Sequence, residues 1–258
     1  MKSFTPWATT AIGHVRYSTA GSEDVCNIQP LHSKTSKGKI AIAHNGNLTN
    51  AYTLYKKLNA EGALFQSTSD TEIIIHLFSR AKGNSPLNAL KKAIQQIEGA
   101  YSLILQGEGY LMAARDPQGF RPLVIGKLST GYIVASETCA LDLIGAKLVR
   151  EVEPGEIIYI DDNGIESHPD VLPVKKAQCI FEHVYFSRPD SIIFGDSVHE
   201  MRKKLGAQLA KEFPVEADIV MAIPDSGNSA ALGYSIESGI PLEFGMTRNH
   251  YVGRTFIQ

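Results

Sequence analysis

The chain has 258 residues, of which 43% are hydrophobic and 20% charged, so it holds enough apolar material for a substantial core. This ordinary globular composition excludes a disordered, collagen-like or low-complexity chain. Lys and Arg number 25 against 27 for Asp and Glu, which leaves a formal net charge of -2 and no global positive field to hold a nucleic acid.

The targeting and cysteine signals are equally plain. No apolar run approaches the roughly 20 residues of a membrane-spanning helix, and the opening residues lack the basic start and apolar core of a secretory signal. These features predict a cytoplasmic protein that makes no membrane contact. Three irregularly spaced cysteines, Cys26, Cys139 and Cys179, indicate reduced thiols rather than a disulfide framework.

Short strands and helices are expected in the first two thirds of the chain. Residues 11–17 and 39–44 have strand-like patterns, and the second run enters a polar sequence at 45–47 that indicates a loop. A helix over about residues 49–61 is expected next. The order predicts a strand, a loop with exposed backbone and then a helix.

Two further helices have recognisable start signals. The first is expected to begin at Ser69, where Ser69 and Glu72 form a capping box, and to end at Gly83. The second has Pro86 at its first helical position and ends before Gly99. Helices followed by antiparallel strands predict a layered α+β domain. The strands are expected at residues 100–106, 110–114, 122–126, 132–135 and 156–161.

The pattern changes after residues 168–178, which contain Pro and Lys without periodicity and predict a linker. A helix over residues 196–213 is followed by a buried strand over 217–223, a Gly-containing turn and a second helix ending near Ser238. Another strand is expected over residues 241–246. This alternation is typical of the start of a parallel sheet.

Two segments near the N-terminus have the chemistry of a binding site. Arg16 is followed by hydroxyl side chains, and a guanidinium with a hydroxyl can hold a carboxylate. A structural ion pair is the alternative. The Gly46 N–H and the Asn45 side chain could form an oxyanion hole, although an ordinary Asn-Gly turn has the same sequence.

Two further segments offer sites for charged groups. Asp70, at an expected helix start, could bind an ammonium group or could simply interact favourably with the helix dipole. The loop of Asp225, Ser226 and Gly227 lies between an expected strand and helix, where backbone N–H groups can bind an anion. It matches neither a Walker loop nor a dinucleotide fingerprint.

The segments GHVRYSTAG, AHNGNLTNA, STSDTE, RDPQGFRPLVIG, FEHVYFSRPDS, PDSG and NHYVGRTFIQ, taken in order, resemble one family, the amidophosphoribosyltransferases. The resemblance implies an α+β glutaminase domain of the N-terminal-nucleophile type over residues 1–170, with stacked antiparallel sheets and helices. It further implies the start of a parallel α/β phosphoribosyltransferase domain over residues 171–258. The implied reaction opens purine synthesis: ammonia from glutamine displaces pyrophosphate from phosphoribosyl pyrophosphate, giving phosphoribosylamine.

The resemblance also implies roles for individual residues. Arg16 and Thr19 would bind the α-carboxylate of glutamine, and Asp70 would bind its ammonium group. Asn45 and the Gly46 N–H would form the oxyanion hole. These roles agree with the chemistry inferred from the residues themselves.

Further ligands follow from the same resemblance. Asp225, Ser226 and Gly227 would form a pyrophosphate loop, with Ser226 at a position associated with Mg²⁺. Cys179 matches the first ligand of a 4Fe-4S cluster in one branch of the family. Purine nucleotides are the implied feedback inhibitors, and the full-length protein is expected to form a homo-oligomer.

The sequence departs from the family at the nucleophile. Members carry a Cys at the mature N-terminus, whereas only 12 residues precede Gly13 here and none is Cys. Cys26 lies inside the chain and has no free amine, so it is not expected to be the nucleophile. The acidic loop that binds the ribose phosphate would lie beyond Gln258. These departures predict an internal fragment of a longer protein that is inactive and marginally stable alone.

Two alternatives remain open. One is a non-catalytic module that binds glutamine or a phosphoribosyl ligand. The other is a different class II glutamine amidotransferase, such as glucosamine-6-phosphate synthase, against which the VYFSRPDS and PDSG segments argue.

Overall fold

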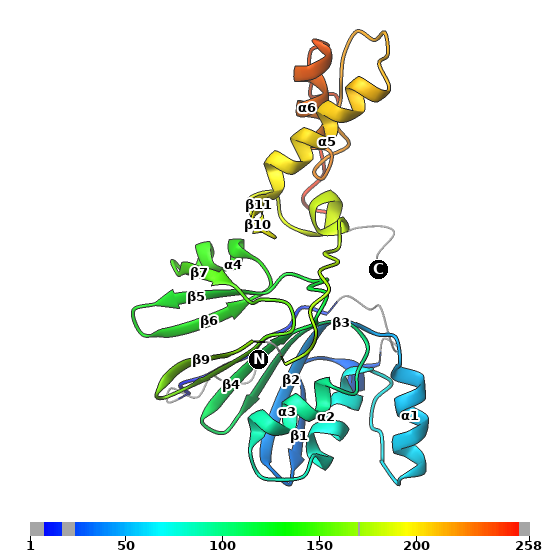
Figure 1. The fold of residues 1–258 in the computed structure, drawn as a ribbon. Coiled ribbons are helices and arrows are strands. Elements are labelled where there is room, and N and C mark those ends of the chain that lie inside the picture. The colour runs from blue at the N-terminus through cyan, green and yellow to red at the C-terminus, as the bar shows by residue number, and fades with distance from the viewer. Residues whose placement is uncertain (1–7, 17–23, 170, 253–258) are drawn as a thin grey trace. The chain divides into compact units, whose positions relative to one another are not determined.

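The computed structural model describes residues 8–16, 24–169 and 171–252 (Figure 1). These residues form two compact units. The first contains residues up to Ser136 together with Ala140–Cys179, and the second contains Glu137–Cys139 together with the residues from Ile180 onward. Within the described ranges, no helix combines the length and apolar character needed to cross a membrane.

A six-stranded antiparallel sheet forms the centre of the first unit. Its strand order is β1-β2-β3-β4-β8-β9, and each neighbouring pair is antiparallel. Most of these strands alternate polar and apolar residues or are buried on both faces, as expected of a sheet covered by other layers. The strands are β1 (Leu31–Thr35), β2 (Gly38–Leu48), β3 (Gly99–Gly107), β4 (Tyr110–Arg115), β8 (Ile157–Asp161) and β9 (Gly164–His168).

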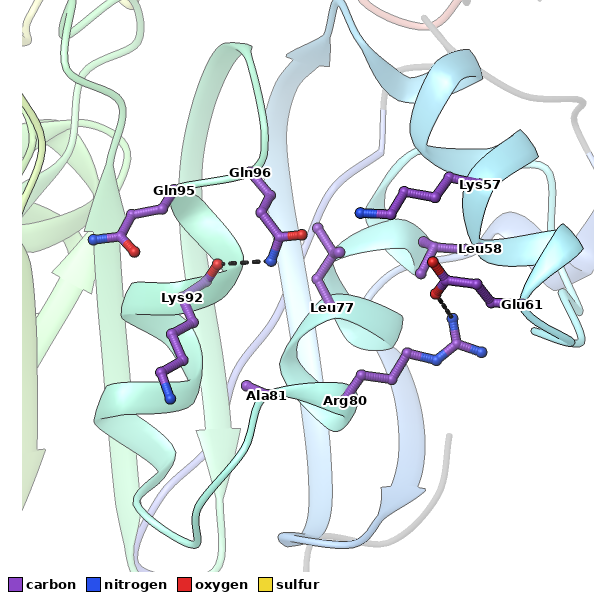
Figure 2. A pocket seen from close by; sticks show the side chains of 9 residues that line it. All are labelled: Lys57, Leu58, Glu61, Leu77, Arg80, Ala81, Lys92, Gln95 and Gln96. Atoms are coloured by element: carbon purple, nitrogen blue, oxygen red, sulfur yellow. Dashed lines mark hydrogen bonds and ion pairs between the residues drawn. The ribbon is translucent and has the colours of Figure 1, made fainter.

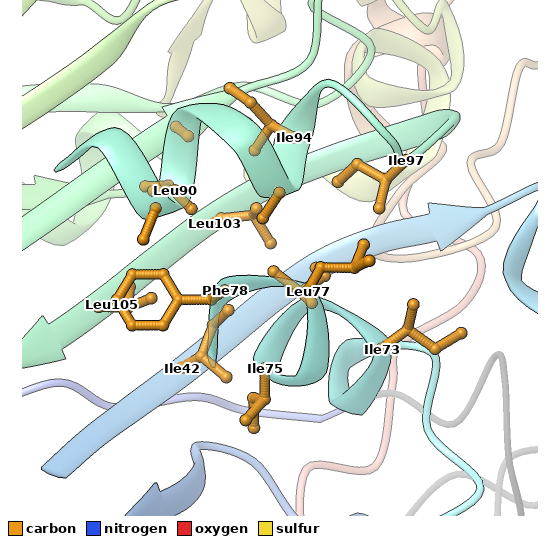
Figure 3. Close-up of a cluster of buried hydrophobic side chains, with 14 of the residues drawn as sticks. Ile42, Ile73, Ile75, Leu77, Phe78, Leu90, Ile94, Ile97, Leu103 and Leu105 are labelled. Carbon is orange, nitrogen blue, oxygen red and sulfur yellow. The ribbon is translucent and has the colours of Figure 1, made fainter. Parts of the chain in front are cut away.

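Helices α2 (Thr71–Arg80) and α3 (Pro86–Ile94) cover one face of this sheet, and α1 (Ala51–Ala60) lies beside α2 (Figure 1). Apolar residues of all three helices recur at helical spacing and join one buried cluster. Figure 3 shows Phe78 of α2 and Leu90 of α3 lying over β2 and β3. This cluster is the largest core of the molecule. Its labelled members also include Ile42, Ile73, Ile75, Leu77, Ile94, Ile97, Leu103 and Leu105.

A second sheet, of order β6-β5-β7, lies on the other face. A smaller cluster joins the two sheets, with Ala113 and Ile158 from the large sheet against Ile125 from the small one. Leu141 of α4 (Thr138–Leu143) packs on the outer side of the small sheet. The first unit is therefore four layers of helices, sheet, sheet and helix. The strands of the small sheet are β5 (Val124–Leu128), β6 (Gly131–Ala135) and β7 (Lys147–Glu151).

The second unit is built on two helices, α5 (Val198–Glu212) and α6 (Asn228–Ser238). Gly206 of α5 lies against the Ala230 backbone, and Gly233 of α6 lies against the Lys203 backbone, so a Cβ at either glycine would collide with a carbonyl. The close approach of the two helices therefore depends on both glycines. The remaining elements are η1 (Val25–Asn27) in the first unit and η2 (Glu182–Phe186), β10 (Ile192–Ile193) and β11 (Asp196–Ser197) in the second.

The five helices predicted from the sequence lie within a few residues of α1, α2, α3, α5 and α6, but α4 was not predicted and several strand predictions were wrong. Residues 45–47, expected to be a loop, belong to β2, where Asn45 pairs with Ser102 and Asn47 pairs with Ala100. Long-range pairing with β3 satisfies this backbone and overrides the local turn signal. Residues 11–16 form no strand. Val15 is 97% exposed, so the apolar pattern that predicted a strand here does not correspond to a buried face.

The expected strands over residues 217–223 and 241–246 are reduced to one parallel bridge between Val220 and Leu242. The prediction that residues 217–223 are buried was wrong, because Ile219 and Met221 are each 45% exposed and Ile223 is 74% exposed. The parallel direction of the bridge agrees with the predicted alternation of strand and helix.

Candidate functional site

His44, near the end of β2, occupies the centre of the candidate site in the first unit. Its side chain is 1% exposed. The ring Nε2 lies 3.2 Å from the Ala100 carbonyl oxygen on β3, and the ring Nδ1 lies 3.3 Å from the Thr71 hydroxyl on α2. A buried imidazole with partners on both nitrogens is fixed in orientation.

Asp70 lies beside this ring, immediately before α2. One carboxylate oxygen accepts a hydrogen bond from the Leu48 N–H at 2.9 Å, and the other lies 3.5 Å from His44 Nδ1. Burial raises the pKa of the carboxyl, but the hydrogen bond and charge of His44 and the backbone N–H groups of Leu48 and Thr71 outweigh burial and lower the pKa overall. Asp70 is therefore a carboxylate at neutral pH, as an ammonium anchor requires.

Gly46 lies two residues beyond His44 on the same strand. Its φ is +153°, and a Cβ there would collide with the Ala100 carbonyl oxygen and lie 2.8 Å from His44 Nε2. Only glycine fits this close approach. Gly46, the oxyanion-hole candidate, and Asp70, the ammonium-anchor candidate, thus both lie close to the His44 ring.

The segment before Asp70 is held on two sides. The Glu72 carboxylate accepts hydrogen bonds from the Gln66 and Ser67 N–H groups at 2.8 and 2.7 Å. The buried Asn27 side chain accepts from the Thr68 N–H and donates to its hydroxyl, both at 2.9 Å. The capping box predicted at Ser69 is therefore different in the structure: Glu72 reaches past Ser69 and fixes the preceding loop.

A cavity of about 580 Å³ opens beside Asp70. Its polar side is the loop of residues 66–70, and its apolar side is formed by Tyr52 and Tyr55 of α1 with Phe65. A volume of this size holds a small-molecule ligand. Cys26 also lines the cavity, but its nitrogen is in a peptide bond and cannot serve as the base of an N-terminal nucleophile.

The remaining predicted glutamine-site residues are described in part. Burial lowers the pKa of His14, and electrostatic repulsion from His44 and Arg16 lowers it further. Asn45 is partly exposed on β2 next to Gly46. Thr19 lies outside the described residues.

A second hollow, of about 360 Å³, lies among the ends of α1, α2 and α3 (Figure 2). Two of its cations already have partners: Arg80 pairs with Glu61 at 3.6 Å, and the Lys92 ammonium donates to the Lys82 carbonyl at 3.1 Å. Basic side chains at helix C-termini stabilise the last turns. None of the predicted site residues lines this hollow, and it is not the candidate site.

In the second unit, Asp225, Ser226 and Gly227 form the turn before α6, as predicted. Asp225 pairs with Arg248 at 3.1 Å, and the Ser226 side chain is exposed. One hydroxyl and one carboxylate suit Mg²⁺ only in combination with ligand phosphates and water, because Mg²⁺ takes six oxygen ligands.

The residues needed for a 4Fe-4S cluster are not gathered around Cys179. Its N–H donates to the Phe120 carbonyl at 3.2 Å, in a run that also pairs Lys175 with Pro117. In the part of the chain that the structure describes, no three His, Cys, Asp or Glu side chains are grouped as metal ligands. A cluster needs four ligands, so these residues do not fit one.

Comparison with known proteins gives consistent matches. The model of the glutamine amidotransferase domain matches residues 14–143, the range that contains the five predicted glutamine-site residues. The amidophosphoribosyltransferase of Rhizobium etli is 51% identical over 253 residues, which cover 96% of this chain and 51% of that protein. The Bacillus subtilis amidophosphoribosyltransferase is 48% identical over 249 residues, covering 96% of this chain and 52% of that protein.

Solved structures agree with these relatives. The structure of glutamine phosphoribosylpyrophosphate amidotransferase from B. subtilis, complexed with ADP and GMP, has a TM-score of 0.89 and 46% identity over 95% of this chain and 53% of that chain. The resemblance inferred from the motifs and the antiparallel glutaminase fold are confirmed. The chain spans about half the length of the curated relatives it matches.

Proposed function

The chain belongs to the glutamine amidotransferase domain family, and we propose that it forms the glutamine site of an amidophosphoribosyltransferase. The observation that carries this proposal is the proximity of both Asp70 and Gly46 to the buried His44 ring, with Asp70 lining a cavity large enough for an amino acid. An ionised carboxylate can bind the α-ammonium of glutamine, and a backbone N–H at residue 46 can donate to an oxyanion.

The proposed roles follow from charge and donor type. The Asp70 carboxylate binds the α-ammonium of glutamine, and Arg16 with Thr19 binds its α-carboxylate. Asn45 and the Gly46 N–H stabilise the oxyanion that forms when a thiolate attacks the side-chain amide. None of the three cysteines of the chain has a free amine, so Cys26, Cys139 and Cys179 are not the nucleophile in this proposal.

The wider reaction is also part of the proposal. Glutamine, phosphoribosyl pyrophosphate and water would yield phosphoribosylamine, glutamate and pyrophosphate. The turn of Asp225, Ser226 and Gly227 would bind the pyrophosphate group, with Mg²⁺ at Ser226. Residues 1–170 would form the glutaminase domain and residues 171–258 the start of the phosphoribosyltransferase domain. A 4Fe-4S cluster at Cys179 would need three further ligands, and the other two cysteines, Cys26 and Cys139, are too few to supply them.

Partners and location follow the same reasoning. A related structure is described as a complex with ADP and GMP, and purine nucleotides are accordingly proposed as feedback inhibitors of the protein that contains this chain. A cytoplasmic location and a homo-oligomeric state are proposed with it.

The decisive experiment uses the longer protein that includes these residues. Ammonia release from L-glutamine is measured with and without phosphoribosyl pyrophosphate, and phosphoribosylamine formation is followed in parallel. We expect Asp70→Asn to reduce ammonia release sharply while phosphoribosylamine formation from added ammonia continues. Equal ammonia release by wild type and Asp70→Asn would refute the assigned site.

The second candidate is a non-catalytic glutamine-binding module. It would use the same cavity, whose lining thiol, Cys26, has its nitrogen in a peptide bond. A module of this kind would bind glutamine without releasing ammonia under any condition, so the same assay separates the two functions.

A further inference from the structure

His44 has contacts that the roles assigned above do not use. It is buried and belongs to the HNGN segment, in which the sequence assigned roles only to Asn45 and Gly46. In the structure its ring lies between β2, β3 and the start of α2.

Both ring nitrogens of His44 have hydrogen-bonding partners. The Ala100 carbonyl can only accept a hydrogen bond, so Nε2 carries a hydrogen whether the ring is neutral or charged. In the neutral ring Nδ1 accepts from the Thr71 hydroxyl at 3.3 Å, and in the charged ring it donates to Asp70 at 3.5 Å. Both forms hold the ring in one orientation.

A closed circuit of hydrogen bonds runs from His44 through Gln29 and Thr71 and back to His44. The His44 backbone N–H donates to the Gln29 side-chain oxygen at 2.7 Å, and the Gln29 amide donates to the Thr71 hydroxyl at 3.2 Å. The Thr71 hydroxyl returns to His44 Nδ1. Strand β2 and helix α2 are therefore fastened together at the residue adjacent to Asp70.

The two sides of the ring face the two halves of the proposed glutamine site. On the Nε2 side, the Ala100 carbonyl that His44 holds is the same group that excludes a Cβ from residue 46. On the Nδ1 side lies the Asp70 carboxylate, which the Leu48 N–H holds from the strand. Moving the ring would shift β2 at Gly46 relative to the Asp70 carboxylate.

We propose that His44 is a positioning residue that sets the Asp70 carboxylate relative to the Gly46 backbone, so that the two ends of glutamine are bound at a fixed separation. This inference rests on the proposed function, because it assumes that Asp70 and Gly46 bind the same molecule. His44 itself makes no bond to the substrate in this assignment.

His44→Gln tests the Nδ1 side of the ring. The side-chain amide nitrogen introduced at position 44 can still donate to the Ala100 carbonyl, whereas nothing replaces Nδ1 beside Thr71 and Asp70. Two ligands are titrated into the 258-residue chain by NMR: L-glutamine, and glutaramate, which lacks the α-ammonium. We expect His44→Gln to weaken L-glutamine binding about tenfold and to leave glutaramate binding within about twofold of wild type.

A second readout needs no ligand. The pKa of the Asp70 carboxyl is followed by carbon-detected NMR, and because the hydrogen bond and charge of His44 lower it, His44→Gln is expected to raise it. His32→Gln, on the exposed face of β1, is the matched control and should change neither quantity. If His44→Gln fails to fold, Thr71→Val opens the same circuit and should shift both quantities in the same direction by less.

The outcomes are distinguishable. An unchanged Asp70 pKa, or equal losses for L-glutamine and glutaramate, would overturn the positioning role while leaving the glutamine site in place. Absence of L-glutamine binding by a wild-type chain whose amide spectrum is that of a folded protein would refute the proposed site, and with it the pairing of Asp70 and Gly46 that the inference assumes.

Discussion

The carboxylate of Glu156 accepts two hydrogen bonds from the guanidinium of Arg150, at 2.7 and 2.8 Å. Arg150 lies on β7 of the small sheet, and Glu156 immediately precedes β8 of the large one, so this pair joins the two sheets of the first unit. Glu156 is 1% exposed and also accepts from the Ser167 hydroxyl and the Glu153 N–H, at 2.5 and 2.7 Å. Its lone pairs are therefore well satisfied despite burial.

Glu156→Gln removes the charge while keeping the shape. One oxygen becomes an amide nitrogen that cannot accept from Arg150, so we expect the free energy of unfolding to fall by about 3 kcal/mol at pH 7. Urea unfolding followed by circular dichroism measures this. Glu166→Gln, at a side chain that is 70% exposed, is the control and should change stability by less than about 0.5 kcal/mol.

The same carboxylate predicts how stability depends on pH. Burial raises the pKa of Glu156, but the hydrogen bonds from Arg150, Ser167 and Glu153 outweigh it and lower the pKa overall. A lowered pKa in the folded state means that this stabilisation is complete above the ordinary glutamate pKa of about 4.3 and is lost as the pH falls through the folded value. The difference in stability between wild type and Glu156→Gln should therefore shrink between about pH 5 and pH 3. A constant difference across that range would contradict the assignment.

An element of the fold could be predicted from the sequence where neighbouring residues determine it, and could not where residues distant in the chain determine it. The start of α3 was predictable, because Ser85 and Pro86 act within one turn, and the Ser85 hydroxyl does accept from the Asn88 N–H. The β-strand at residues 45–47 was not, because its partner is residues 100–102, far away in the chain. Local turn chemistry at Asn-Gly gives no information about that pairing.

The candidate site likewise contains residues that could be predicted from the sequence and contacts that could not. Asp70 and Gly46 were predictable as residues of suitable chemistry, and the motif resemblance assigned their roles. That His44, Gln29 and Thr71 form a closed hydrogen-bonded circuit between them depends on tertiary contacts spanning 15 to 42 residues, which no spacing pattern reports. Asn27, which fixes Thr68, was missed for the same reason.

Gly46→Ala tests the close approach of β2 and β3. The added methyl group would collide with the Ala100 carbonyl and crowd His44 Nε2, in a backbone conformation that side chains disfavour. We expect a loss of about 3 kcal/mol in unfolding free energy. Differential scanning calorimetry measures it, with Gly131→Ala as the control because nothing lies within 4 Å of a Cβ at that position. A melting temperature equal to wild type for Gly46→Ala would show that the strands separate without cost.

Asp70→Asn tests the ammonium anchor separately from the fold. The asparagine oxygen can still accept from the Leu48 N–H, so the start of α2 should remain in place while the negative charge is lost. We expect L-glutamine affinity to fall at least about tenfold, because a charge-assisted hydrogen bond is replaced by a neutral one. NMR titration gives the affinity, and Asp142→Asn at an exposed position of α4 is the control. Retained affinity in Asp70→Asn would place the ammonium elsewhere.

Gly206→Ala tests whether the second unit depends on the contact between α5 and α6. The new methyl group would collide with the Ala230 carbonyl, and the helices would have to separate. Alanine favours a helix over glycine by about 1 kcal/mol, which opposes the collision, so we expect a net loss of about 2 kcal/mol. Hydrogen exchange of α5 and α6 amides reports this unit by itself. Gln208→Ala, on the exposed face of α5, should leave their protection unchanged. If Gly206→Ala protects these amides better than wild type, helix propensity outweighs packing and the close contact is not required.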